Sequence, residues 1–330
     1  MSPAELRALA RDRPLVTSEL HPFNAFYGHA AILKAYAGLP PDRPLKVLIE
    51  HGFSTHDAIP ELEHRPRLPV YLCQSERRAR LADKAGARGL AIGPLILYAD
   101  ALATPRPARE RTRLLLFPAH SAHFSRVRYD VARFLRSIEE FAAGFDELQV
   151  CLYWRDVLLG MAEPYEALGL PVVTAGHIFD PSFLCRLRDI LAAADAIATN
   201  EVGTHIPYAV ALGRTAYLVE QETVTENEPW IAPDSLAIYE REQGDPPPLL
   251  REARRVFAEP TRVVTATQRE FVERSAGMRL VRTPPELRNL LLDAEATYRS
   301  STGSLERLEI LLRARLRHAR GLVRTRLASP

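Results

Sequence analysis

The stretch ATNEVGTHIPYAVALGR, residues 198–214, predicts a strand end, a polar turn and a helix in immediate succession. The apolar run at 196–198 is typical of a buried strand, and 206–212 is a helix-like run closed by a glycine. A second strand pattern follows at 215–219. Between strand and helix, residues 199–204 carry more polar groups than a connection requires, so this turn is a candidate ligand site.

The same unit repeats on the N-terminal side of this stretch. Across residues 113–220, short apolar runs alternate with helical patterns at about 20–25 residues per unit, which is typical of right-handed crossovers and a parallel sheet. The expected strands are 113–117, 148–154, 171–175, 196–199 and 215–219, and the expected helices are 129–143, 156–168, 181–194 and 206–212. We therefore expect an α/β layer structure in this part of the chain.

The rest of the chain predicts a second α/β domain and a helical tail. Residues 1–105 alternate less regularly, with strands expected at 46–49 and 69–73 and helices at 27–37 and 74–85. Residues 101–112 are rich in Pro and Arg without a period and are expected to link the domains. The prediction is two Rossmann-like domains, 1–105 and 113–295, facing a cleft, with a helix within 296–330 and a loop at 223–248.

Composition excludes several protein classes. The 330 residues are 47% hydrophobic and 25% charged, as in ordinary globular proteins, and the net charge of +2 gives no general electrostatic case for nucleic acid. Cys73, Cys151 and Cys185 lie far apart, which favours free thiols in a reducing, cytoplasmic compartment. We see neither a secretion signal nor a run of 18 apolar residues in the sequence, so we expect a cytoplasmic protein without a membrane span.

Four polar loops are expected at one edge of the sheet in 113–220. In open parallel sheets, ligands bind beyond the carboxyl ends of the strands, and a helix N-terminus there suits a phosphate. For Thr199 and Asn200 the alternative is a plain helix N-cap, and for His177 it is a histidine bonded to backbone. The candidate donor-binding residues in these loops are His120, Ser121, Gly176, His177, Thr199, Asn200, Gly203 and Thr204.

The N-terminal domain offers a general base and an acceptor side. His51 and Gly52 follow a predicted strand directly in IEHGFSTHD, and Asp57 lies near, so either His51 or Asp57 is a candidate base for an acceptor hydroxyl. The alternative is a turn at Gly52 capped by His51. In HPFNAFYGH the candidate acceptor-side residues, which alternatively only open a helix, are Asn24, Tyr27 and His29.

Familiar cofactor and metal motifs do not occur. The sequence contains no GxGxxG, GxxxxGK[ST] or GxSxG pattern, which disfavours a dinucleotide enzyme, a P-loop NTPase and an α/β-hydrolase. His120 and His123 alone are too few ligands for a zinc site at the usual spacing. We therefore expect neither a metal nor a cofactor.

Taken with these loops, the chain resembles glycosyltransferases of the two-Rossmann-domain (GT-B) architecture. It is most similar to transferases of bacterial surface-polysaccharide clusters, which make capsule, O-antigen and teichoic-acid-like polymers. In them the C-terminal domain holds the nucleotide-activated donor, whose phosphate rests on a helix N-terminus. TNEVGTHIPYAVALGR matches that position, TAGHIFDP resembles the histidine-bearing strand end before it, FPAHS the first donor loop and HGF the acceptor-side loop. The resemblance covers about residues 15–295.

Two departures from the family pattern narrow what the resemblance implies. The E-x(7)-E pattern of retaining donor domains is absent from residues 198–214, which favours inversion, and Asn-Glu-Val-Gly-Thr replaces the Ser-Ser pair of polyol-phosphate transferases. GT-B enzymes generally use no bound metal. The resemblance implies that a glycan or lipid-linked acceptor hydroxyl attacks the donor sugar, that Asp57 or His51 takes its proton, and that His177, Gly203 and Thr204 stabilise the leaving nucleotide phosphate.

Two other functions share this architecture. A nucleotide-sugar 2-epimerase would need acidic residues around the sugar, for which Asp180 and Glu201 are available. A non-catalytic subunit that binds nucleotide sugars or glycans would keep the cleft and lose the base. Turnover of a single substrate without acceptor would indicate the first, and binding without turnover the second.

The C-terminal region is distinct in charge. Residues 304–327 hold seven Arg against Glu306 and Glu309, and leucines recur at roughly helical spacing. Such a helix can lie on an anionic membrane surface, here the inner face of a membrane, or pack across both domains through its leucines. The sequence leaves both alternatives open.

Overall fold

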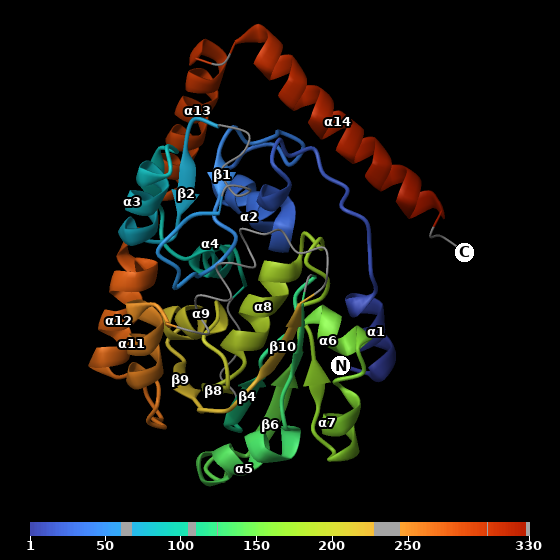
Figure 1. Ribbon diagram of the computed structural model, residues 1–330, viewed down its shortest axis with the longest axis vertical. Coiled ribbons are helices and arrows are strands. Elements are labelled where there is room, and N and C mark those ends of the chain that lie inside the picture. The colour runs from blue at the N-terminus through green and yellow to red at the C-terminus, as the bar shows by residue number, and fades with distance from the viewer. Residues whose placement is uncertain (61–67, 105–109, 124, 228–244, 302, 328–330) are drawn as a thin grey trace.

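The computed structural model describes residues 1–60, 68–104, 110–123, 125–227, 245–301 and 303–327. These residues form two parallel β-sheets flanked by helices, with a long helix at the C-terminal end (Figure 1). The predicted α/β class, with two parallel-sheet units and a helical tail, is confirmed. Among the helices in these ranges, none is long and apolar enough to cross a membrane.

The larger sheet has five parallel strands in the order β7-β6-β4-β8-β9. Their bounds are β4 Arg113–Phe117, β6 Glu147–Cys151, β7 Val172–Val173, β8 Ala196–Thr199 and β9 Thr215–Leu218. The parallel sheet predicted for 113–220 is confirmed. Because the chain builds outward from β4 to β7 and then returns to the other side at β8, the strand order reverses between β4 and β8, which is where such sheets usually bind ligands.

Helices connect these strands, and one prediction about them is wrong. Their bounds are α5 Val131–Ala142, α6 Trp154–Leu158, α7 Glu163–Ala167, α8 Phe183–Ala192 and α9 His205–Ala211. Helix α5 begins where the Asp130 carboxylate accepts a hydrogen bond from the Arg133 N–H at 2.9 Å. The single helix predicted for 156–168 is two helices, because Gly160 adopts a left-handed φ of 81° between them.

The smaller sheet has three parallel strands in the order β1-β2-β3. Its elements are the 3-10 helix η1 Pro22–Gly28, α2 His29–Tyr36, β1 Leu48–Ile49, β2 Tyr71–Cys73, α3 Glu76–Lys84, β3 Gly89–Ala91 and α4 Leu95–Ala101. The helix predicted over 27–37 begins two residues late, because Tyr27 and Gly28 have φ angles of 56° and 75°. The linker predicted at 101–112 lies between α4 and β4, and its residues 105–109 are outside the described ranges.

The N-terminal helix packs on the larger sheet, and a helix near the C-terminus packs on the smaller sheet. Helix α1, Pro3–Ala10, buries Leu6 and Ala10 in the core of the larger sheet. Helix α13, Pro284–Ser301, returns to the smaller sheet, where Glu295 pairs with Arg43 at 2.7 Å. Each half is therefore completed by a segment from the opposite end of the sequence.

The two halves share one apolar core. A single cluster of buried side chains joins Ile49 and Leu72 of the smaller sheet with Leu115 and Ile197 of the larger sheet. Apolar contact between the halves is thus continuous beneath the facing sheet edges, which fixes how the polar loops at those edges meet.

The remaining elements lie C-terminal to β9, apart from one strand. Strand β10, Val224–Asn227, pairs antiparallel with β5, Ser125–Arg128, so the loop predicted for 223–248 is wrong at 224–227, while 228–244 lie outside the described residues. The helices that follow are α11 Pro248–Val256, α12 Ala266–Ala276, the 3-10 helix η3 Met278–Leu280 and α14 Ser304–Leu327.

The backbone conformation of Gly28 and a close neighbour both exclude a side chain at this position. Its φ is 75°, and a Cβ there would stand 2.1 Å from the Pro181 carbonyl oxygen. We expect Gly28→Ala to lower the free energy of unfolding by about 1–3 kcal/mol, because backbone strain and the clash add. Urea unfolding beside Gly86→Ala is the measurement, since Gly86 has a φ of 83° and nothing within 4 Å. Equal losses in the two variants would show that the contact with Pro181 contributes nothing.

Candidate functional site

The polar loops of the two halves meet at the carboxyl edge of the larger sheet. The Phe53 N–H, just after β1, donates to the Thr204 hydroxyl at 3.1 Å, and a Cβ on Gly52 would stand 2.8 Å from that oxygen. Because Gly52 has no side chain, the loop after β1 approaches the loop after β8 closely. We call Tyr27, His51, His120, Tyr153, Glu201 and Thr204, which lie around this contact, the edge cluster.

His51 and two tyrosines form the N-terminal side of the edge cluster. The Tyr27 hydroxyl lies 3.4 Å from His51 Nε2 and 3.4 Å from the Tyr153 hydroxyl. Burial, with a smaller effect of His123, lowers the pKa of His51 to about 4, and burial raises the pKa of Tyr27 to about 12. Within the described residues, His51 Nδ1 is buried without a hydrogen-bond partner. At neutral pH the His51 imidazole is therefore neutral.

His120 and Glu201 form an ion pair at the point where the strand order reverses. His120 follows β4, Glu201 follows β8, and His120 Nδ1 lies 2.8 Å from Glu201 Oε2. Burial opposes protonation, but the charge and hydrogen bond of Glu201, with Asp156, raise the pKa of His120 to about 9. The His120 side chain is 39% exposed, and its Nε2 has no hydrogen bond to another described residue. The imidazolium can therefore donate Nε2–H to an anion.

The residues just after β8 hold the turn together. Thr199 accepts the Glu201 N–H at 3.1 Å, and its hydroxyl lies 2.9 Å from His205 Nε2. Asn200 Oδ1 accepts the Ala119 N–H at 2.7 Å. The N-cap position of α9 is Thr204, so the alternative that Thr199 or Asn200 caps this helix is wrong.

The side-chain amide of Asn200 makes a further hydrogen bond on the other side of the turn. Its Nδ2 donates to Gln221 Oε1 at 2.8 Å, and the side chain is buried. A Cβ on Gly203 would stand 2.9 Å from His205 Cε1, so only glycine leaves the histidine ring in place. The side chains of Thr199 and Asn200 therefore act on the shape of the turn.

Ser121 has a similar supporting place. Its N–H donates to the buried Asp156 carboxylate at 3.1 Å, and its hydroxyl accepts the Val127 N–H at 3.0 Å. Ser121 has no measurable exposure. Burial raises the pKa of Asp156. Ser121 and Asp156 thus fix the loop that carries His120.

His177 is engaged by the N-terminal segment. Its Nε2 lies 3.1 Å from Asp12 Oδ1, its Nδ1 accepts the Phe179 N–H at 3.1 Å, and its own N–H donates to the Leu9 carbonyl. Burial, against the opposing charge of Asp12, lowers the pKa of His177 to about 4. Neighbouring Gly176 has a φ of 94° and packs against Arg186. Both ring nitrogens of His177 are therefore bonded within the chain, which matches the backbone-bonded alternative.

The other N-terminal candidates have different surroundings. Asp57 is an exposed carboxylate that pairs with Arg77 at 3.2 Å. Asn24 is buried and bridges backbone, donating to the Val47 carbonyl at 2.8 Å and accepting the Ile49 N–H at 3.0 Å. His29 is buried beside the Tyr27 ring, and burial lowers its pKa to about 3.

The structure thus brings His51, Tyr27, His120, Gly203 and Thr204 of the predicted set to one edge. Tyr153 was not predicted, although it directly precedes the polar residues 154–156 that the sequence marks as a sheet-edge loop. Glu201 was predicted only for an epimerase, and its pairing with His120 depends on the adjacency of β4 and β8. In the part of the chain that the structure describes, three or more His, Cys, Asp or Glu side chains nowhere gather as a metal site would require.

Comparison with known proteins adds two distant likenesses. No protein-family model and no curated protein matches the chain. A provisionally assigned UDP-N-acetylglucosamine 2-epimerase from Listeria monocytogenes is 10% identical, with 92% of this chain and 82% of that one covered and a TM-score of 0.36. The glycotransferase of kitacinnamycin is 16% identical, with 82% and 73% covered and a TM-score of 0.30. Likenesses at this level carry no argument about the activity.

Proposed function

We propose that the chain is a glycosyltransferase that moves a sugar from a nucleotide-activated donor to a hydroxyl of a glycan or lipid-linked acceptor. The observation that carries the proposal is the His120–Glu201 pair, a partly exposed imidazolium beside the reversal of strand order. A cation in this place suits the phosphate of a bound nucleotide. The sequence resemblance to transferases of bacterial surface polysaccharides supports the same class.

Residues of the edge cluster have different roles in the proposed reaction. The acceptor oxygen forms a bond to the anomeric carbon while the bond from that carbon to the phosphate oxygen breaks. His120 Nε2–H donates to the phosphate as negative charge develops, and the Thr204 hydroxyl and the backbone at Gly203 lie on the neighbouring turn after β8, which carries Glu201. The neutral imidazole of His51 takes the proton of the acceptor hydroxyl. We prefer His51 to Asp57 as the base because Arg77 already pairs with Asp57.

Several predicted ligand contacts receive a supporting role in this proposal. Asn24, Ser121, Thr199 and Asn200 hold loops through bonds to the chain itself, and His177 holds the N-terminal segment. Gly176 packs against Arg186, and His29 packs against the Tyr27 ring. No cofactor, metal or nucleic acid enters the proposal.

The epimerase alternative receives less support from the geometry. Asp180, one of its two acidic candidates, pairs with Arg186 at 2.6 Å and with Arg13 at 3.1 Å. Glu201, the other, pairs with His120. Neither carboxylate is free to face a sugar, so we do not propose this activity.

The test is His120→Gln in the full chain, assayed for nucleotide release from UDP-, GDP-, CDP- and CMP-sugars with an acceptor panel. We expect turnover to fall about 100-fold, because one preformed donor to the leaving phosphate is lost. His318→Gln on α14 is the matched control and should retain activity. Unchanged turnover in His120→Gln would remove the proposed site. Thermal stabilisation by a nucleotide without any turnover would favour the non-catalytic subunit instead.

A second variant separates a charge effect from a packing effect. Glu201→Gln removes the carboxylate that raises the pKa of His120, so His120 should lose its proton at a lower pH than in the wild type, where the pKa is about 9. The alkaline limb of the pH–rate profile should shift downward while the acidic limb stays in place. An unshifted alkaline limb would show that the charge of His120 does not act in turnover.

A further inference from the structure

Helix α14 contacts the body of the protein through one face. Ile310 and Ala314 are buried together with Leu20. Near the other end, a Cβ on Gly321 would stand 2.3 Å from the Leu15 carbonyl oxygen, so glycine permits the helix to lie directly on the N-terminal segment. These positions recur at helical spacing, and they define the docked face of α14.

The opposite face of α14 is exposed, and Arg315 lies among its apolar members. With 100° per residue, these apolar members project away from the docked face. They are Leu308, Leu311, Leu312, Leu316, Leu322 and Val323, with exposed fractions between 38% and 63%. We call these residues the outward face. Figure 1 shows α14 running along the outside of the molecule, away from both sheets.

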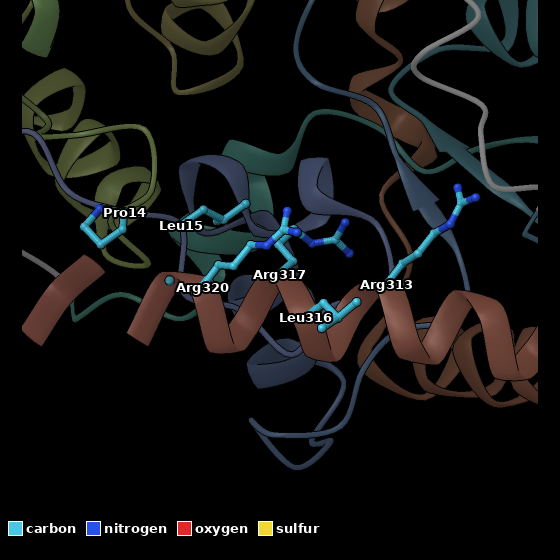
Figure 2. A pocket seen from close by; sticks show the side chains of 7 residues that line it. Pro14, Leu15, Arg313, Leu316, Arg317 and Arg320 are labelled. Atoms are coloured by element: carbon cyan, nitrogen blue, oxygen red, sulfur yellow. The ribbon is translucent and has the colours of Figure 1, made fainter. Parts of the chain in front are cut away.

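An arginine groove lies along one flank, between the docked and outward faces. It has a volume of about 540 Å³ and is lined by Pro14, Leu15, Arg313, Leu316, Arg317 and Arg320, beside the close approach of the helix (Figure 2). Arg317 is fixed by donation to the Leu20 carbonyl at 2.8 Å. Arg320 makes no hydrogen bond or ion pair with any other residue that the structure describes. The Arg320 guanidinium is therefore uncompensated beside an apolar surface, whereas Arg313 of the same groove pairs with Glu309.

The charge of α14 contrasts with that of the chain. Residues 304–327 carry seven Arg and two Glu, whereas the whole protein has a net charge of only +2. The rest of the chain is therefore slightly acidic, and positive charge is concentrated on this one helix. A partner that matches it must present apolar material next to negative charge.

We propose that the outward face of α14 docks on the surface of an anionic phospholipid membrane and that the arginine groove takes a lipid headgroup phosphate. In this placement the leucines enter the boundary of the acyl chains, and Arg313 and Arg320 lie at the level of the phosphates. The docked face holds the body of the protein against the surface. This inference does not depend on the proposed sugar transfer, because no residue of the edge cluster takes part.

The experiment is co-sedimentation of the full chain with phosphatidylcholine vesicles and with vesicles that contain about one third phosphatidylglycerol. We expect binding to the anionic vesicles alone. Arg320→Gln should weaken it about fivefold, as the loss of one basic group near the surface does. Leu308→Ser with Leu312→Ser should weaken it roughly tenfold or more. Inorganic phosphate at constant ionic strength should not displace the protein, which separates a lipid headgroup from a free anion.

Matched controls make each part of the proposal refutable. Arg279→Gln removes an exposed charge from η3, and Val263→Ser removes an exposed apolar side chain from the α11–α12 connection. Equal binding by Arg320→Gln and Arg279→Gln would overturn the groove. Equal binding to both kinds of vesicle, or no binding to either, would contradict the proposal that α14 docks on an anionic membrane. A dimer in sedimentation velocity that Leu308→Ser with Leu312→Ser dissolves would assign the outward face to a second copy.

Discussion

Acidification from pH 7 to pH 5 is expected to lower the free energy of unfolding by about 3–6 kcal/mol, through buried histidines that stay neutral in the fold. Burial lowers the pKa of His29 to about 3, and that of His177 and His205 to about 4. Below pH 6.5 these histidines bind protons in the unfolded chain but stay neutral in the folded chain. Each of them therefore destabilises the fold progressively as the pH falls to its folded pKa. We allow about 1–2 kcal/mol for each histidine at pH 5.

His120 offsets only a small part of this loss, because most of its stabilisation is already present at pH 7. Its pKa is raised to about 9, so the stability that it contributes is fully present below its unfolded value near 6.5 and is lost as the pH rises from there through 9. Urea unfolding at pH 7 and pH 5 measures the difference. His29→Gln should reduce the decrease in unfolding free energy between pH 7 and pH 5 by about 1–2 kcal/mol. In the control variant His318→Gln, this decrease should be larger than in His29→Gln. An equal stability of the wild type at both pH values would contradict the neutral state of these histidines.

Arg78→Ala is expected to lower the free energy of unfolding by about 3–5 kcal/mol, because it strands a buried charge. Arg78 Nε and Glu50 Oε1 lie 2.5 Å apart, and each side chain is 3% exposed. The same Glu50 carboxylate accepts the Gln74 N–H at 2.7 Å, and Arg78 also donates to the Ala58 carbonyl at 3.0 Å. Removing the guanidinium leaves Glu50 without its counter-charge in the core of the smaller sheet.

Arg80→Ala is the control for this prediction. Arg80 pairs with Glu76 one turn away at 3.6 Å, with both side chains 68% exposed, so its loss should cost about 0.5 kcal/mol or less. Chemical denaturation of both variants gives the comparison. The double variant Glu50→Gln with Arg78→Met should regain part of the loss, because no unpaired charge is left. If Arg78→Ala costs no more than Arg80→Ala, the buried pair does not stabilise the fold.

The sequence predicts the larger sheet well because its signal is local. Apolar runs such as 113–117 and 196–199 are bounded by polar residues or proline, and each becomes a strand at the expected place. The helix over 156–168 fails where one glycine, Gly160, turns the backbone to positive φ. The destination of α1 was not predictable in this way, because Leu6 and Ala10 indicate an apolar helix face and do not say which sheet covers it.

For the candidate site, the sequence predicts where the polar loops lie. It does not predict where the side chains of these loops point. Thr199 and Asn200 lie at the predicted sheet edge, but the partners of Asn200 are Ala119 and Gln221, which are distant in the chain. The charge of His120 likewise depends on Glu201, 81 residues away. Residue type and spacing carry no information about such pairings until β4 and β8 lie side by side.

The crossed ends of the chain bear on how the protein folds during synthesis. The smaller sheet emerges from the ribosome first, yet Leu287 and Leu291 of α13 belong to the core that it shares, and Tyr298 packs with Leu48. Long-range contacts of this kind delay folding, since the closing segment must be present before it can pack. The N-terminal half therefore cannot complete its core until nearly the whole chain has been translated, and chaperones would meet it in that unfinished state.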